Sequence, residues 1–533
     1  MMENKERGLV IRAAGLLMVV QVLSRVLGYA RDVVMVNIFG AGFSTDAWNA
    51  AFLIPDTLYQ VLIGGAIGSA LIPVFSSYIN TDRDRDGWEA NSVFSSWFML
   101  ILTVLLALAG IFTKFLLERT TGFSAEEMPL PIALTRITLI QAFFMALSAI
   151  ATGLLQSYKH FFWPAVGSLL YNIVILLCGV LLVGPIEALW PGYGIASFSV
   201  GVVIGALVTL LVQLPMLKKV GFRFHLSFDT HNQGMRQMIK LLIPVVIGLS
   251  VTKLNLFVTQ NLATGRLEGG LYTLLLTANR FMQLPLGVFA VSMATAIFPT
   301  MSAQAAQGKL EDMKSSISMG VRNITFVLLP STVGLIMLRE PIIRLLYEFS
   351  GQFTAADTYA TCQALFYYCL GLLFYGTVTV FIRGFYAIQN TVTPIVVSVS
   401  CIAVNIIFSY LLVGPLGHRG LALAYSLAGF VQCSATLIAL RRKIGSMDLR
   451  NMLSCLLKTG LACVLMGLAV WGATWGCQQL LGVDSKLTQL IQVGAGLGVG
   501  VIVFFLVAGL MKMEEMKTVV GTLTRKLHRK KAA

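Results

Sequence analysis

Long apolar runs alternate with short polar loops along almost the whole chain. About fourteen of these runs reach the roughly 20 residues that a helix needs to cross the hydrocarbon core of a bilayer. This pattern predicts an all-α polytopic membrane protein with about 14 transmembrane helices. The runs lie near residues 11–40, 45–79, 90–117, 131–157, 161–184, 192–217, 238–264, 270–305, 317–338, 356–388, 393–414, 419–440, 451–478 and 487–511.

The composition is that of a membrane protein. The chain is 57% hydrophobic and 12% charged, whereas soluble domains carry about 25% charged residues. Its net charge of +15 comes from basic residues spread over short loops and the tail, so we expect no nucleic-acid surface. These residues are more frequent in alternate loops, which places both termini in the cytoplasm by the positive-inside rule. The basic residues expected there include Arg83, Lys218, Lys219, Arg442 and Arg529.

A long-range repeat with an offset of about 230 residues divides the chain. Copies with an even number of helices keep the same orientation, so we expect two six-helix lobes around a central cavity, related by an axis along the membrane normal. The predicted parts are an N-lobe at 1–217, a basic cytoplasmic linker at 218–240, a C-lobe at 241–443, two further helices at 444–512 and a basic cytoplasmic tail at 513–533. The matching sequences are LLVGP at 181–185 and 411–415, Pro164 and Pro394, and IPVFS at 72–76 with FPTMS at 298–302.

Catalytic and metal-binding motifs are absent from the sequence. There is no G-x-S-x-G, H-E-x-x-H or Walker sequence, and the five histidines are separated and lie near loops. The eight cysteines form no C-x-x-C pair and lie mostly in apolar runs, so we expect buried thiols. Gly64, Gly65 and Gly68, and GAGLGVG at Gly494–Gly500, predict close helix packing. We therefore predict a transporter without a cofactor, not an enzyme.

The first apolar run carries charges inside the expected membrane span. In SRVLGYARD, helical spacing places Ser24 and Arg31 on one line and Arg25 and Asp32 on the next. An arginine in mid-span costs at least about 2.5–3.5 kcal/mol to insert, so it normally faces a water-filled cavity or a partner charge. A purely structural alternative is that Arg31 pairs with Asp32 or Asp46, or that both arginines reach to an interface.

Arg280 places a third arginine in the second half of the chain, within TANRFMQLPLGVF. A guanidinium stays ionised and can bind phosphate through two parallel hydrogen bonds. Arg25, Arg31 and Arg280, divided between two lobes, therefore predict a clamp for a diphosphate group. Lys253 and Arg383 also fall in apolar runs, but we leave both outside the predicted substrate contacts.

Five segments of the chain carry a family resemblance. They are SRVLGYARDVVMVNIFGAG, STDAWNAAFLIPD, GGAIGSALIPVFSSYI, ANRFMQLPLGVFAVSMATAIFPTMS and RGFYAIQNTVTP. In matching order over about the first 440 residues, they resemble the MurJ (MviN) family of lipid II flippases. The resemblance implies the multidrug/oligosaccharidyl-lipid/polysaccharide exporter fold, with the two last helices forming a groove for a polyprenyl tail.

The same resemblance implies a substrate, a location and site residues. The substrate would be lipid II, an undecaprenyl-diphosphate-linked disaccharide-pentapeptide, flipped by alternating access to the outer leaflet of the bacterial inner membrane for peptidoglycan synthesis. We expect a monomer, with coupling to membrane potential or a monovalent ion. The family's substrate-binding residues match Arg25, Arg31, Arg280 and Ser24, and its gating or charge-pairing acids match Asp32 and Asp46.

The chain departs from the family pattern at four positions. Tyr59 and Gly64 stand where well-studied proteobacterial members carry an arginine and a glutamate, and Asn279 stands where they carry an aspartate. Asn390 replaces an acidic residue before T-x-T-P.

Other functions are alternatives to this prediction. A flippase for another polyprenyl-diphosphate-linked saccharide would need the same cationic cavity. A multidrug or cation antiporter of the same fold would prefer acidic or apolar cavity groups, since cavity arginines repel cationic substrates. A membrane enzyme of lipid-phosphate metabolism and a division scaffold without transport are further alternatives.

Overall fold

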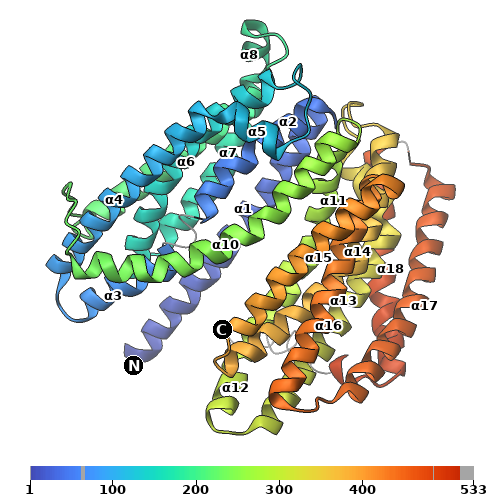
Figure 1. Ribbon diagram of the computed structural model, residues 1–533. Coiled ribbons are helices and arrows are strands. Elements are labelled where there is room, and N and C mark those ends of the chain that lie inside the picture. Colours follow the sequence, from blue (N-terminus) through green and yellow to red (C-terminus); the bar gives the residue numbers. More distant parts are fainter. Residues whose placement is uncertain (1, 62–66, 484, 517–533) are drawn as a thin grey trace. The chain divides into compact units, whose positions relative to one another are not determined.

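The computed structural model describes residues 2–61, 67–483 and 485–516, and all secondary structure in them is helical. The chain divides into two compact units, Met1–Gly270 and Leu271–Ala533, called unit 1 and unit 2 (Figure 1). The prediction of an all-α fold is confirmed.

Unit 1 contains the first ten α-helices. Within it α7 packs on α1 and α9, α6 packs on α2 and α9, and α10 runs along α2, α3, α4 and α5 (Figure 1). Aromatic rings fill its core, with Phe75 and Trp88 4.9 Å apart between ring centroids. Its elements are α1 (Met2–Phe39), α2 (Phe43–Tyr59), the π-helical turn η2 (Ile67–Leu71), α3 (Ile72–Asn80), α4 (Asp84–Ile111), α5 (Thr113–Thr120), α6 (Pro129–Ser157), α7 (Phe162–Leu181), α8 (Val183–Leu189), α9 (Ala196–Lys219) and α10 (Gln233–Arg266).

Unit 2 contains the remaining helices. Here α14 packs on α11, α13 and α16, while α17 and α18 pack on each other and on α13 (Figure 1). Phe326 of α13 and Phe504 of α18 hold that contact, with ring centroids 5.1 Å apart. Its elements are α11 (Leu271–Pro285), the π-helical turn η3 (Leu286–Ala290), α12 (Val291–Ala306), α13 (Leu310–Tyr347), α14 (Ala355–Ala387), α15 (Val392–Leu416), α16 (His418–Ile444), α17 (Leu449–Leu481) and α18 (Lys486–Leu510).

Local sequence signals set several helix ends. The hydroxyl of Thr354 accepts a hydrogen bond from the backbone N–H of Asp357, whose carboxylate accepts from the backbone N–H of Thr354, so a capping box begins α14. The Ser485 hydroxyl caps α18 in the same position. Gly40 and Gly482 follow α1 and α17 with φ of 71° and 68°, a conformation that favours glycine at helix C-termini.

Eleven helical segments among the described residues are long and apolar enough to cross a membrane. The predicted runs near 11–40, 45–79 and 238–264 are not among them. In the described residues these runs correspond to α1, to α2 with η2 and α3, and to α10. At about 1.5 Å per residue, the 38 residues of α1 still extend about 57 Å. The count of 14 stays a prediction.

Matching features occur in the two units at the repeated sequences. In unit 1, η2 leads directly into α3, which begins with IPVFS, and in unit 2, η3 leads into α12, which contains FPTMS. Pro164 and Pro394 both lie in the first turn of a helix, α7 and α15. These features support the proposed internal repeat.

The helix α10 packs within unit 1, although its residues from 241 onward belong to the predicted C-lobe. Gly265 of α10 lies so close to Gly122 that a Cβ atom on either glycine would clash with the other. The lobe and linker boundaries drawn from the sequence stay a prediction.

The glycines and cysteines named in the sequence analysis take the predicted places in part. A Cβ at Gly496 would lie 2.5 Å from Leu338, and one at Gly500 would lie 2.9 Å from Val470, so both permit close packing. Gly494 and Gly498 instead face open space. All eight cysteines of the chain are free thiols, and five of them are buried. Gly64 and Gly65 lie outside the described residues.

Candidate functional site

Arg31 and Asp32 form an ion pair on α1, inside unit 1. Nε and Nη2 of Arg31 both donate to Oδ1 of Asp32, at 3.0 and 2.9 Å. The guanidinium also lies 5.8 Å from the ring centroid of Trp48 on α2, a cation–π contact. The two charged side chains are 15% and 6% exposed. The pairing of Arg31 with Asp32 considered above is therefore present.

A second ion pair joins α2 to α10. Its acidic partner, Asp56, follows Trp48 by eight residues, which is about 12 Å along α2. Nζ of Lys253 is 3.2 Å from Oδ2 of Asp56, and the side chains are 10% and 24% exposed. Nε2 of Gln60 donates to both oxygens of the same carboxylate, at 3.0 and 2.8 Å.

Lys253 is thus a candidate site residue that the sequence reasoning leaves out. The signal for it was its place inside an apolar run, where a lysine is costly without a cavity or partner. Tyr59, where the family resemblance implies an arginine, lies one turn from Asp56 at the end of α2. Through its contact with Asp56, Lys253 brings a cation from α10 to the end of α2 that holds Tyr59.

The residues of the predicted polar face of α1 lie in different surroundings. The Ser24 hydroxyl lies 2.9 Å from the Ser168 hydroxyl on α7, and Asn172 Nδ2 donates to the Ser24 oxygens at 3.2 Å. Ser24 is buried in this helix contact, whereas Arg25 is exposed. These contacts show that the Ser24 hydroxyl is used in the packing of α1 on α7. The role of Ser24 in substrate binding stays a prediction.

Asp46 anchors the segment that follows α10. Its Oδ2 accepts a hydrogen bond from the backbone N–H of Gly270 at 2.7 Å, and the residue is 2% exposed. Gly270 has φ +96°, and a Cβ atom there would lie 2.3 Å from the carbonyl oxygen of Ala41. Only glycine fits this close approach. The predicted gating or charge-pairing role of Asp46 stays a prediction beside this contact.

Arg280 lies half-buried in α11 of unit 2. The preceding Asn279 accepts a hydrogen bond from Gln283 on the same helix. Because Arg280 belongs to unit 2 and Arg31 to unit 1, the diphosphate clamp between them stays a prediction.

An apolar groove runs between α13 and α17 in unit 2. Its volume is about 470 Å³, and one wall includes Leu329, Val333 and Met337 of α13. The facing wall comes from α17 and includes Gly460 and Trp471. This lining suits a hydrocarbon chain, since it offers almost no polar atoms.

In the described part of the chain all secondary structure is helical and eleven helices are apolar and long enough to cross a membrane, which is the architecture of a polytopic membrane protein. The family model described as lipid II flippase MurJ matches residues 35–491, so the chain belongs to this family. "Lipid II flippase MurJ" of Burkholderia cenocepacia is 27% identical over 460 residues, which are 85% of this chain and 88% of the relative. "Probable lipid II flippase MurJ" of Rhizobium tropici is 28% identical, over 96% of this chain and 95% of the relative.

Solved structures agree with this assignment. One described as lipid II flippase MurJ in an inward closed conformation aligns with a TM-score of 0.76 and 27% identity, over 93% of this chain and 98% of that chain. An inward-facing MATE family multidrug transporter of the MOP superfamily aligns with a TM-score of 0.66 and 17% identity, over 79% and 94%. The second likeness shows a shared fold.

These comparisons decide between the functions considered from the sequence. The family resemblance and the prediction of a transporter, not an enzyme, are confirmed. Lipid II flipping is favoured over a multidrug antiporter, because the family model and the relatives of nearly full length are lipid II flippases. The chain is a multi-pass membrane protein.

Proposed function

We propose that this chain moves lipid II from the cytoplasmic to the outer leaflet by alternating access, with its diphosphate bound by intramembrane cations. The observation that carries the proposal is the largely buried Arg31 guanidinium held between Asp32 and Trp48. It occurs in a chain of the lipid II flippase family. An arginine fixed in this way presents a permanent charge and a planar set of donors to a phosphate.

The ion pair leaves Arg31 able to bind a second anion. A guanidinium has five N–H donors, and Asp32 engages two of the nitrogens through one oxygen. The remaining donors suit a phosphate oxygen. Asp32 in this proposal holds the guanidinium in place when no substrate is bound, which offsets the cost of an unpaired charge in the membrane.

Other cations complete the proposed site. Lys253 adds a point charge in unit 1 beside Asp56, and Arg25 and Arg280 are the remaining family positions. A diphosphate bound by both units would favour the closed state only through its higher affinity for that state. Membrane potential or a monovalent ion would then assist release, since one charge crossing 100 mV corresponds to about 2.3 kcal/mol.

The polyprenyl tail would lie in the groove between α13 and α17 while the head group crosses. A chain of isoprene units needs an apolar surface of this kind, and burial of each CH₂ group contributes about 0.8 kcal/mol. We further propose a monomer with both termini in the cytoplasm. Labelling of a single cysteine placed at Lys218 from the inner side alone would agree with this orientation, and labelling from the outer side would contradict it.

The test of the proposed site uses the purified full chain in liposomes that contain fluorescent lipid II. Arg31→Lys keeps the charge but loses the planar donors, so we expect initial flipping to fall roughly tenfold or more, as for the loss of one charge-assisted hydrogen bond. Arg83→Lys is the control, because Arg83 lies at the surface in a pair with Asp86. Wild-type flipping by both Arg31→Lys and Arg31→Ala would remove Arg31 from the site.

A further inference from the structure

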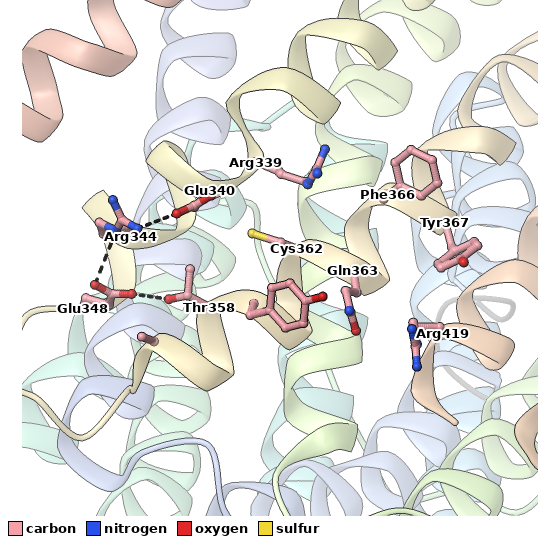
Figure 2. A pocket seen from close by; sticks show the side chains of 12 residues that line it. Arg339, Glu340, Arg344, Glu348, Thr358, Cys362, Gln363, Phe366, Tyr367 and Arg419 are labelled. Atoms are coloured by element: carbon pink, nitrogen blue, oxygen red, sulfur yellow. Dashed lines mark hydrogen bonds and ion pairs between the residues drawn. The ribbon is translucent and has the colours of Figure 1, made fainter. Parts of the chain in front are cut away.

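A charged cavity lies at one end of unit 2, between α13, α14 and α16 (Figure 2). Its volume is about 500 Å³. The last turns of α13, the first turns of α14 and the start of α16 form its walls, which carry three arginines and two glutamates. None of these residues belongs to the proposed diphosphate clamp.

One arginine of the cavity is already neutralised. Arg344 pairs with Glu340 one turn before it, and its Nε lies 3.8 Å from Oε2 of Glu348 one turn after it. Thr358 of α14 donates its hydroxyl hydrogen bond to Glu348. Figure 2 shows these side chains linked to each other on one side of the cavity. Both carboxylates of the cavity are therefore engaged by Arg344 and Thr358.

The other two arginines are not paired with a carboxylate among the described residues. Arg339 donates from Nη1 to the carbonyl oxygen of Ile336 at 2.6 Å and lies 5.8 Å from the ring centroid of Phe366. The Nε of Arg419 is buried and has no hydrogen-bond partner in the described part of the chain. Buried donors without partners are rare in folded proteins, because each costs about 1–3 kcal/mol.

Arg339 also lies far from the end of its helix. It precedes the last residue of α13, Tyr347, by eight residues, which is about 12 Å. Arg339 directly follows the predicted apolar run at 317–338, so we expect it at the end of the membrane span, where water and soluble anions can reach the cavity. An anion bound in the cavity would provide the counter-charge that Arg339 lacks among the described residues.

We propose that this cavity binds a water-soluble phosphate-type oxyanion through Arg339 and Arg419. Guanidinium groups match the oxygens of phosphate with paired hydrogen bonds, and Gln363 and Tyr359 add neutral donors to the wall. The lining contains aromatic and small side chains but no long aliphatic one, and its charged side chains favour a polar ligand over an acyl chain. A volume of about 500 Å³ exceeds one phosphate group, so the cavity has room for a second phosphate or another small polar group.

Calorimetric titration with inorganic diphosphate tests the proposal. The full chain is placed in phosphatidylcholine nanodiscs at constant ionic strength. Arg339→Gln and Arg419→Gln should each weaken diphosphate binding by about tenfold or more, and Arg339→Lys, which keeps the charge and guards against a folding defect, should weaken it less. Lys114→Gln, which removes an exposed charge from α5, should leave the affinity unchanged.

Two further experiments distinguish this cavity from the proposed diphosphate clamp and from a lipid-headgroup site. Arg31→Gln should leave the diphosphate site of unit 2 intact. If Arg31→Gln instead abolishes all binding while the variants at Arg339 and Arg419 bind normally, the inference is wrong and the proposed clamp stands. Phosphatidylglycerol in the nanodiscs should not compete. Competition that depends on Arg339 would assign the cavity to a lipid headgroup and overturn a soluble ligand, and the absence of wild-type binding would overturn the site.

Discussion

Removing one partner of the Lys253–Asp56 ion pair should destabilise unit 1 more than removing both. At 3.2 Å, the Coulomb attraction has an upper bound of about 5 kcal/mol with an effective dielectric constant of about 20. Lys253→Met leaves a carboxylate largely buried, and Asp56→Asn leaves an ammonium largely buried, so each should cost about 2–3 kcal/mol. The double variant removes both desolvated charges and should cost about 1 kcal/mol. The expected coupling energy is therefore about 3–5 kcal/mol in magnitude.

The assay is reversible unfolding of the purified protein in detergent, followed for the wild type, both single variants and the double variant. The control is the same cycle on Lys114 and Glu118, which are 3.9 Å apart and 69% and 49% exposed. Its coupling should stay below about 0.5 kcal/mol. If the coupling at Lys253 and Asp56 is no larger than in this control, the pair is not a buried charge pair and the place of Lys253 in the proposed diphosphate site is wrong.

Three further changes have expected outcomes. Gly270→Ala should lower the free energy of unfolding by at least about 1–3 kcal/mol, because the new Cβ meets the carbonyl oxygen of Ala41 and φ is positive; wild-type stability in thermal unfolding would contradict this. Asp46→Ala should cost about 1.5–3 kcal/mol for the lost hydrogen bond to Gly270, measured in the same way, and Asp46→Asn should cost less. Gly460→Leu should fill part of the groove and slow lipid II flipping at normal protein abundance, whereas Gly472→Leu, also on α17 in open space, should not; equal rates would exclude the groove from transport.

The helical fold and the family could be predicted from the sequence because both depend on local patterns. Membrane helices must satisfy their backbone hydrogen bonds internally, so apolar length alone indicates most spans. The segment SRVLGYARD and its companions carry the family resemblance through residue identity and order. Arg31 could be selected because an arginine in an apolar run is costly wherever the chain folds.

Contacts between distant helices could not be predicted in this way. Ser24 shares a polar line with Arg31 on α1, yet it packs against Ser168 of α7, since neighbouring helices decide which polar residue is covered. Lys253 is recognisable as costly, but its partner Asp56 is 197 residues away in sequence. The pairing of α10 with unit 1 likewise depends on tertiary packing, such as the approach of Gly265 to Gly122.

The leaflet in which lipid II accumulates is the most direct measure of the proposed function. In the native host, depletion of this protein should leave lipid II in the cytoplasmic leaflet, where an enzyme or probe added from outside cannot reach it. Restoring the wild-type chain should return lipid II to the outer leaflet, and restoring Arg31→Ala at equal abundance should not. Lipid II that reaches the outer leaflet in depleted cells, or equally well with Arg31→Ala, would contradict flipping through an arginine-bound diphosphate.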